Sequence, residues 1–114
     1  MFGFDAARTL VRMAEDPDAS GREIAARAWP VFEGQRPAEI PVEHDLSGKP
    51  IGTTRHPVVL VAAAGAADAA GDSRARDKLL NAAGALDRGT PTYYGAAWVA
   101  LGRIMLTTDA LASC

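Results

Sequence analysis

One segment of the chain is apolar at almost every position, and it restricts the fold more than any other feature. It spans residues 57–70, begins with Pro57 and carries a single charge, at Asp68. Proline is tolerated in the first turn of a helix, and a helix that is apolar on all sides is buried between other elements. The segment therefore predicts an inner helix with cover on both sides, in a mostly α fold.

Four further helices are predicted by apolar residues at three- and four-residue spacing. They are expected over residues 5–15, 21–30, 73–86 and 93–107. Ser20 and Glu23 form a capping-box pattern, which places the start of the second helix at Gly21. Pro30 is expected to end or kink that helix. Apolar helices thus alternate with amphipathic ones through short turns, a pattern typical of stacked helical hairpins.

The amphipathic helices are each expected to turn one face to the core. In the second helix the inward residues are predicted to be Ile24, Ala25, Ala28 and Trp29. Trp29 and Phe32 are candidates for stacking on a sugar, but aromatic side chains at helical spacing are more often core, and that interpretation is preferred. In the helix over 73–86, Arg76 is expected to face outward with its charged neighbours.

Residues 34–54 lose the helical pattern because prolines interrupt it. Two short apolar runs flank this region's turn-forming residues, so we expect a short β-hairpin that closes around Ser47 and Gly48. Such an insertion lies at a surface, and a connector without a ligand role is the preferred interpretation. His44 and His56 lack metal-ligand spacing and are expected to be surface residues, so no metal or cofactor is predicted.

The balance of charge argues against two classes of partner. The chain has 12 basic and 14 acidic residues, a net charge of −2 and no run of like charge. Nothing therefore supports nucleic-acid binding or polybasic membrane docking. The longest apolar stretch is too short to span a bilayer, and residues 1–3 lack the features of a secretion signal. Cys114, the single cysteine, is expected to be an exposed thiol or to pair outside this chain.

Alanine supplies much of the 48% hydrophobic content, and larger apolar residues are thinly spread. Because alanine buries little area, we expect the helices to pack against a segment absent from this chain or to self-associate through their apolar faces. Residues 1–114 are accordingly interpreted as a single partial domain.

The first helix carries Asp5 and Arg8 outside its apolar stripe. Residues three apart are neighbours on a helix surface, and an acid in the first turn faces the positive end of the helix dipole. One interpretation is therefore structural: the aspartate stabilises the start of the helix, and the arginine pairs with it.

The other interpretation rests on two short segments. Phe4-Asp5-Ala6-Ala7-Arg8 resembles the Tyr-Asp-Ala-x-Arg segment that carries the catalytic base in family 8 glycoside hydrolases, with phenylalanine in place of tyrosine. Thr90-Pro91-Thr92-Tyr93-Tyr94-Gly95, which leads into an apolar helix, is similar to the Tyr-Tyr segment before that family's last long helix. In this order they resemble the C-terminal third of such an enzyme.

That resemblance implies a fold and a reaction. The helical hairpins would form part of an (α/α)6 barrel, and the parent enzyme, secreted or periplasmic, would hydrolyse a β-1,4-glucan-type polysaccharide or oligosaccharide with inversion. The resemblance implies Asp5 as general base and Arg8 as the residue that orients it. It also implies substrate binding by Phe4, Tyr93 and Tyr94. The family's general acid is a glutamate near the start of the enzyme and has no counterpart here, so the chain alone is expected to be inactive.

A second class of function fits another part of the chain. Residues 71–106 also resemble a tetratricopeptide-type hairpin, a unit of peptide-binding scaffolds. Such scaffolds need about three copies at a ~34-residue period. Only one copy is found, and residues 34–54 break the period. A helical protein-interaction scaffold is therefore the alternative to the glycosidase interpretation.

Overall fold

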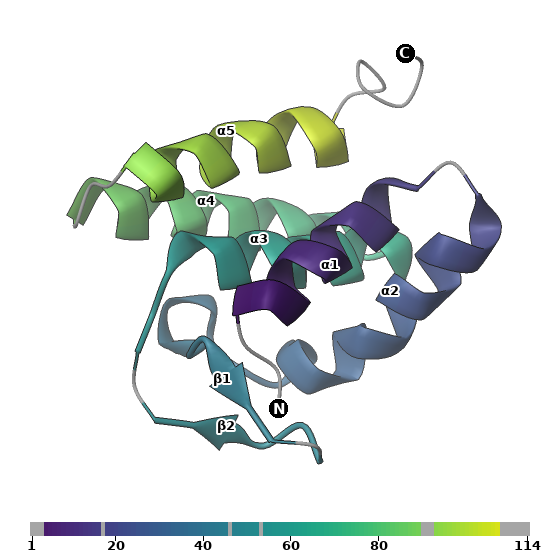
Figure 1. Cartoon of the computed structure of the whole chain (residues 1–114), viewed down its shortest axis with the longest axis horizontal. Coiled ribbons are helices and arrows are strands. Elements are labelled where there is room, and N and C mark those ends of the chain that lie inside the picture. Colours follow the sequence, from purple (N-terminus) through teal and green to yellow (C-terminus); the bar gives the residue numbers. More distant parts are fainter. Residues whose placement is uncertain (1–3, 17, 46, 53, 90–92, 108–114) are drawn as a thin grey trace.

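The described part of the chain folds into five α-helices and one short β-hairpin (Figure 1). The computed structural model describes residues 4–16, 18–45, 47–52, 54–89 and 93–107, without the side chains of Phe4, Asp5, Tyr93 and Tyr94. The elements are α1 (Phe4–Glu15), α2 (Ala19–Glu33), the short 3-10 helix η1 (Pro37–Glu39), β1 (Glu43–His44), β2 (Pro50–Ile51), α3 (Pro57–Ala69), α4 (Ser73–Gly89) and α5 (Tyr93–Thr107). The prediction of a mostly α fold with one β-hairpin is confirmed.

Helix α3 is the centre of the fold. Every residue from Pro57 to Ala67 is buried, and α3 contacts each of the other four helices. His56 caps its start, because the Nδ1 of His56 accepts a hydrogen bond from the N–H of Val58 at 3.0 Å. The predicted inner helix is therefore confirmed. Its cover comes from this chain's own helices, so the absent covering segment expected from the alanine content is not required for α3.

Successive helices alternate in direction. In Figure 1, α1, α3 and α5 run one way, and α2 and α4 run the other way. Two glycines let α3 approach its neighbours closely. A Cβ atom added at Gly65 of α3 would lie 2.9 Å from the Cβ of Ala14 on α1. A Cβ added at Gly102 of α5 would lie 2.6 Å from Cγ1 of Val61 on α3. The missing side chains at these positions therefore set the spacing of α1, α3 and α5.

A cluster of charges joins the carboxyl ends of α1, α3 and α5. Asp68, near the end of α3, lies 2.8 Å from Nη1 of Arg76 and 3.7 Å from Nη2 of Arg22. The same arginines donate hydrogen bonds to backbone carbonyls, Arg76 to Leu106 at 3.3 Å and Arg22 to Ala14 at 3.2 Å. The prediction that Arg76 faces outward is wrong, because its guanidinium turns back onto Asp68 and its side chain is only 19% exposed.

The start of α2 differs from the prediction. The helix begins at Ala19 instead of Gly21 because Asp18, and not Ser20, is its N-cap. Oδ1 of Asp18 accepts hydrogen bonds from the backbone N–H of Ser20 at 2.9 Å and from its hydroxyl at 3.0 Å. Aspartate and serine are both favoured N-caps, so the sequence pattern alone did not separate them.

The end of α2 also lies beyond its predicted limit. Pro30 stands inside the helix, which continues to Glu33. Phe32, in the last turn, is 1% exposed, and burial of its ring offsets the hydrogen bond that proline cannot donate. Ile24, predicted to face inward, is 48% exposed. It lies about 100° around the helix from the buried Ala25, outside the inward stripe.

The β-hairpin has its predicted place and form. β1 and β2 are antiparallel, with His44 opposite Pro50. Asp45 holds the turn, since its Oδ1 accepts hydrogen bonds from the backbone N–H of Ser47 at 2.8 Å and of Lys49 at 3.0 Å. Gly48 has a φ of +88°, which glycine adopts without steric penalty. The predicted closure around Ser47 and Gly48 is confirmed.

The prediction that both histidines are surface residues is wrong for His44, whereas His56 is partly exposed. His44 is fully buried, with its Nε2 2.9 Å from Nε2 of Gln35. Its ring meets that of Phe32 edge-on, with the ring centroids 5.4 Å apart. His56 is partly buried where it caps α3. The contacts of His44 come from Phe32 and Gln35, which lie around the end of α2, so local sequence does not reveal them.

Acid is expected to destabilise the fold through these histidines. Burial lowers the pKa of His44, against a smaller opposing effect of Asp45, and burial likewise lowers the pKa of His56. Below about pH 6.5 the unfolded chain therefore binds more protons than the folded chain, so the free energy of unfolding falls as the pH falls. Urea titrations between about pH 7.5 and pH 5.5 measure this slope. We expect the free energy of unfolding to depend less on pH in His44→Gln than in the unsubstituted chain. Equal dependence in the two proteins would contradict a contribution of His44.

Candidate functional site

A groove lies between α1 and α5, the first and the last of the described helices. It has a volume of about 420 Å³ and is lined by Arg8, Thr9, Arg12, Trp98, Leu101 and Met105. We refer to it as the α1–α5 groove. Arg8 belongs to α1, near the start of the sequence, and Trp98 belongs to α5, near its end. The groove is thus the place where these distant parts of the chain meet.

Helical spacing explains which side chains line the α1–α5 groove. Arg8 and Arg12 are one turn apart, so they share the exposed face of α1, while Leu10 and Val11 are buried. On α5, Trp98, Leu101 and Met105 follow at intervals of three and four residues and form one stripe. Trp98 is partly buried and Leu101 is 42% exposed. The groove therefore has a basic wall on α1 and an apolar wall on α5.

The charges of the α1–α5 groove are of one sign. Nη1 of Arg12 pairs at 3.0 Å with Oε1 of Glu15, a residue that does not line the groove. The Arg12 side chain is 74% exposed. Among the described residues that line the groove, none is acidic. The groove therefore offers hydrogen-bond donors and apolar surface, and an acidic group there must come from other residues.

Only one of the sequence-predicted site residues has a described side chain. Arg8 is exposed and lines the α1–α5 groove. The side chains of Phe4, Asp5, Tyr93 and Tyr94 lie outside the described part. Their backbones begin α1 and α5, which run the same way (Figure 1). The predicted residues thus belong to the first turns of two helices that share one groove.

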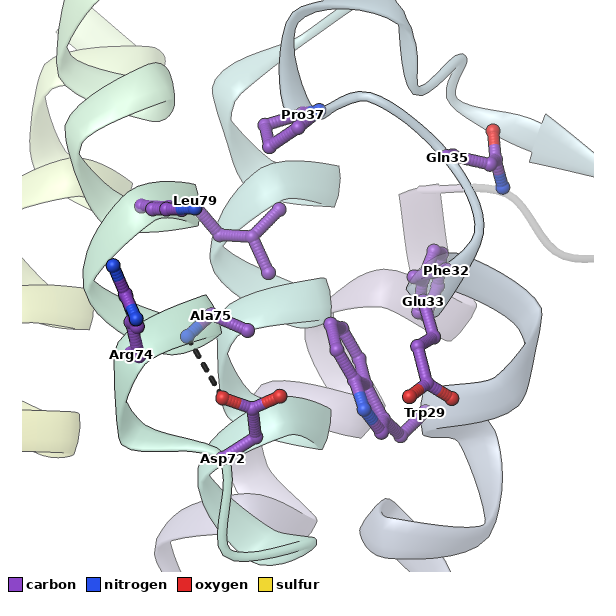
Figure 2. A pocket seen from close by; sticks show the side chains of 10 residues that line it. Trp29, Phe32, Glu33, Gln35, Pro37, Asp72, Arg74, Ala75 and Leu79 are labelled. Carbon is purple, nitrogen blue, oxygen red and sulfur yellow. Dashed lines mark hydrogen bonds between the residues drawn. The ribbon is translucent and has the colours of Figure 1, made fainter.

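A second hollow lies on another side of α3, between α2, η1 and the start of α4 (Figure 2). It has a volume of about 290 Å³ and is called here the Trp29 pocket. The residues that matter for its chemistry are Trp29, Glu33, Asp72, Ala75, Lys78 and Leu79. Figure 2 shows the indole of Trp29 standing between the carboxylates of Glu33 and Asp72. Sequence reasoning did not predict this pocket.

The two aromatic residues of α2 have different environments. Phe32 is buried, which confirms the preferred core interpretation. Trp29 packs against the core with part of its ring and lines the Trp29 pocket with another part. The apolar spacing predicted an inward position, but it did not show that α4 leaves one side of the indole uncovered.

Two other kinds of site find no support in the described part of the chain. No three histidine, cysteine, aspartate or glutamate side chains are grouped there so that they could hold a metal ion. No described helix combines the length and apolar character needed to cross a bilayer. Cys114 lies outside the described residues.

Comparison of the chain with protein-family models, with curated proteins and with solved structures gives no match in any of the three. An assignment of function therefore depends on the residues themselves and on the geometry of the two hollows.

Proposed function

We propose that this chain is the base-bearing, C-terminal part of a glycoside hydrolase that resembles family 8. In this proposal its helical hairpins form part of an (α/α)6 barrel, and the α1–α5 groove contacts a β-1,4-linked glucan. The observation that carries the proposal is that Arg8 and Trp98 line one groove, although 89 residues lie between them in the sequence. Arg8 belongs to the first of the two segments on which the resemblance rests, and Trp98 lies shortly after the second.

The groove's chemistry suits a saccharide. A pyranose ring has an apolar face of C–H groups, which packs on an aromatic ring, and hydroxyl groups, which accept hydrogen bonds from a guanidinium. Trp98 supplies the ring, and Arg8 and Arg12 supply the donors. Because these side chains stand on helices, a bound sugar meets them at a fixed spacing.

The proposed reaction needs two carboxyl groups. In an inverting glycosidase one protonates the leaving oxygen, and the other removes a proton from the attacking water. By resemblance Asp5 is the base, and Arg8 keeps its carboxylate ionised and oriented through a charge-assisted hydrogen bond. No described residue that lines the groove can serve as the acid. The proposal therefore gives this chain glucan binding without hydrolysis of its own.

Binding is tested with tryptophan fluorescence, because the chain has two tryptophans, one at each hollow. Trp29→Phe leaves Trp98 as the only indole, and we expect a saturable change in its emission on titration with cellohexaose. In that background Arg8→Gln should weaken binding about tenfold, since a hydrogen bond to a charged group contributes about 1.5 kcal/mol. Arg27→Gln, an exposed arginine of α2, is the matched control and should bind normally.

Two outcomes would count against the proposal. One is a Trp98 emission that cellohexaose leaves unchanged while the chain is folded by circular dichroism. The other is equal binding by the Arg8→Gln and Arg27→Gln variants. A response of Trp98 to unrelated helical peptides, with none to cellohexaose, would favour the interaction scaffold instead.

A further inference from the structure

We propose that the Trp29 pocket is a separate binding site for one pyranose ring of a neutral saccharide. It is built by α2, η1 and α4, whereas the α1–α5 groove is built by α1 and α5. The two hollows share no lining residue, so this site goes beyond the proposed glucan contact at α1 and α5.

The planar indole of Trp29 forms the main apolar surface of the pocket and packs against the core. Trp29 is partly buried and packs on the core, which holds the indole in place. Ala75 and Leu79 of α4 line the same hollow, and Leu79 is only 2% exposed. A fixed aromatic face with aliphatic side chains beside it matches the C–H face of a sugar ring.

The polar part of the pocket lies around the indole. The carboxylates of Glu33 and Asp72 stand on its two sides (Figure 2). Oδ1 of Asp72 accepts a hydrogen bond from the N–H of Ala75 at 3.0 Å, so this side chain is fixed as the cap of α4. Within the described part of the chain, no hydrogen bond or ion pair occupies the Glu33 carboxylate. Its two oxygens are therefore available to accept hydrogen bonds from sugar hydroxyls.

Charge and size select among possible ligands. The lining holds two acidic residues, Glu33 and Asp72, and two basic residues, Arg74 and Lys78. The formal charges of the pocket therefore sum to zero near neutral pH. A neutral ligand that both donates and accepts hydrogen bonds suits this balance. A quaternary ammonium ion also binds indoles and carboxylates, but here it would meet two cations. A volume of about 290 Å³ is near the lower limit for small-molecule pockets, which favours a single sugar ring.

The test uses the full chain with Trp98→Phe, which leaves Trp29 as the only indole. Cellobiose and methyl β-glucoside are titrated while Trp29 emission is recorded. We expect saturable binding with a dissociation constant in the millimolar range, and Glu33→Gln should weaken it about tenfold. Glu23→Gln is the matched control, because Glu23 is an exposed glutamate of the same helix outside the pocket. Thermal unfolding shows that each variant is folded.

Each outcome decides the proposal. A saturable Trp29 response that Glu33→Gln weakens and Glu23→Gln preserves supports it. An unchanged Trp29 emission, or a stronger response to tetramethylammonium than to either sugar, overturns it. The result does not depend on the α1–α5 groove, since Trp98 reports on the groove and Trp29 on the pocket. A failure at one indole therefore leaves the other proposal standing.

Discussion

The Gly102→Ala substitution is expected to destabilise the fold by about 2 kcal/mol. A Cβ atom at this position of α5 would lie 2.6 Å from Cγ1 and 3.2 Å from Cγ2 of Val61 on α3. Valine has one strongly preferred rotamer in a helix, so these methyl groups cannot turn aside, and overpacking of this kind costs up to about 3 kcal/mol. Alanine regains about 1 kcal/mol of helix propensity, which leaves a net loss. Urea denaturation measures the change in the free energy of unfolding.

Gly84→Ala on α4 is the matched control for this prediction. A Cβ there would meet only the guanidinium ends of Arg103 and Arg88, at 3.3 and 3.4 Å, which are the far ends of long, exposed side chains. The control is therefore expected to stabilise the fold by up to about 1 kcal/mol through helix propensity. Val61→Ala should remove part of the loss caused by Gly102→Ala, with a coupling of about 1 kcal/mol in a double-mutant cycle. Equal effects at the two glycines would show that α3 and α5 are not in close contact.

The sequence predicted the helices well where their pattern is strong. The uninterrupted apolar run made α3 recognisable as an inner helix, and the predicted limits of α5 agree with the structure. The turn residues around Gly48 likewise indicated the hairpin. These features depend on neighbours in the sequence, so local patterns are enough to find them.

The errors have a different physical origin, because they concern contacts between elements. Arg76 looks like a surface residue of an amphipathic helix, and only the position of α3 shows that it pairs with Asp68. His44 looks polar and exposed, but the hairpin folds it against Phe32. Pro30 should break a helix, yet the burial of Phe32 keeps the last turn of α2 in place. Tertiary packing overrode the local preference in each case.

The two hollows were equally hard to predict. Trp29 and Leu79 lie fifty residues apart, and Arg8 and Trp98 lie farther apart still. Helical spacing shows which face of each helix is apolar, but it does not show where two helices diverge and leave an indole uncovered. The sequence therefore identified Arg8 as a candidate and assigned Trp29 to the core, while the Trp29 pocket appears only in three dimensions.

Asp68→Ala is the second substitution with a large expected effect, about 2 kcal/mol of lost stability. The side chains of Asp68 and Arg76 are 18% and 19% exposed, so their 2.8 Å contact is only weakly screened by water. Loss of the carboxylate leaves the partly buried Arg76 with only one acidic partner in the described part of the chain, Asp77, whose carboxylate lies 3.0 Å from Nε of Arg76 and whose side chain is 60% exposed. Removing one partner of a fully buried pair costs about 3–5 kcal/mol, whereas an exposed pair contributes about 0–1 kcal/mol. This pair lies between those limits.

Arg22→Ala provides the comparison. Its contact with Asp68 is longer, at 3.7 Å, and its side chain is 42% exposed, so we expect a loss below about 1 kcal/mol. Asp68→Ala and Arg76→Ala should be far from additive, because either one removes the same contact. Urea denaturation of the three single variants and the Asp68–Arg76 double variant measures each loss in the free energy of unfolding and their departure from additivity. Equal losses for Asp68→Ala and Arg22→Ala would contradict the importance of the short contact.

Asp68→Ala is also expected to affect the α1–α5 groove. Arg76 also donates a hydrogen bond to the carbonyl of Leu106, one residue after Met105 of the groove lining. Without Asp68, Asp77 at Nε is left to orient the guanidinium, so we expect Arg76 to hold the end of α5 against α4 less firmly. We therefore expect Trp98 emission in the Asp68→Ala variant, measured with Trp29→Phe, to become more accessible to acrylamide quenching. Trp29 emission, measured with Trp98→Phe, should change less, because the Trp29 pocket does not involve α5.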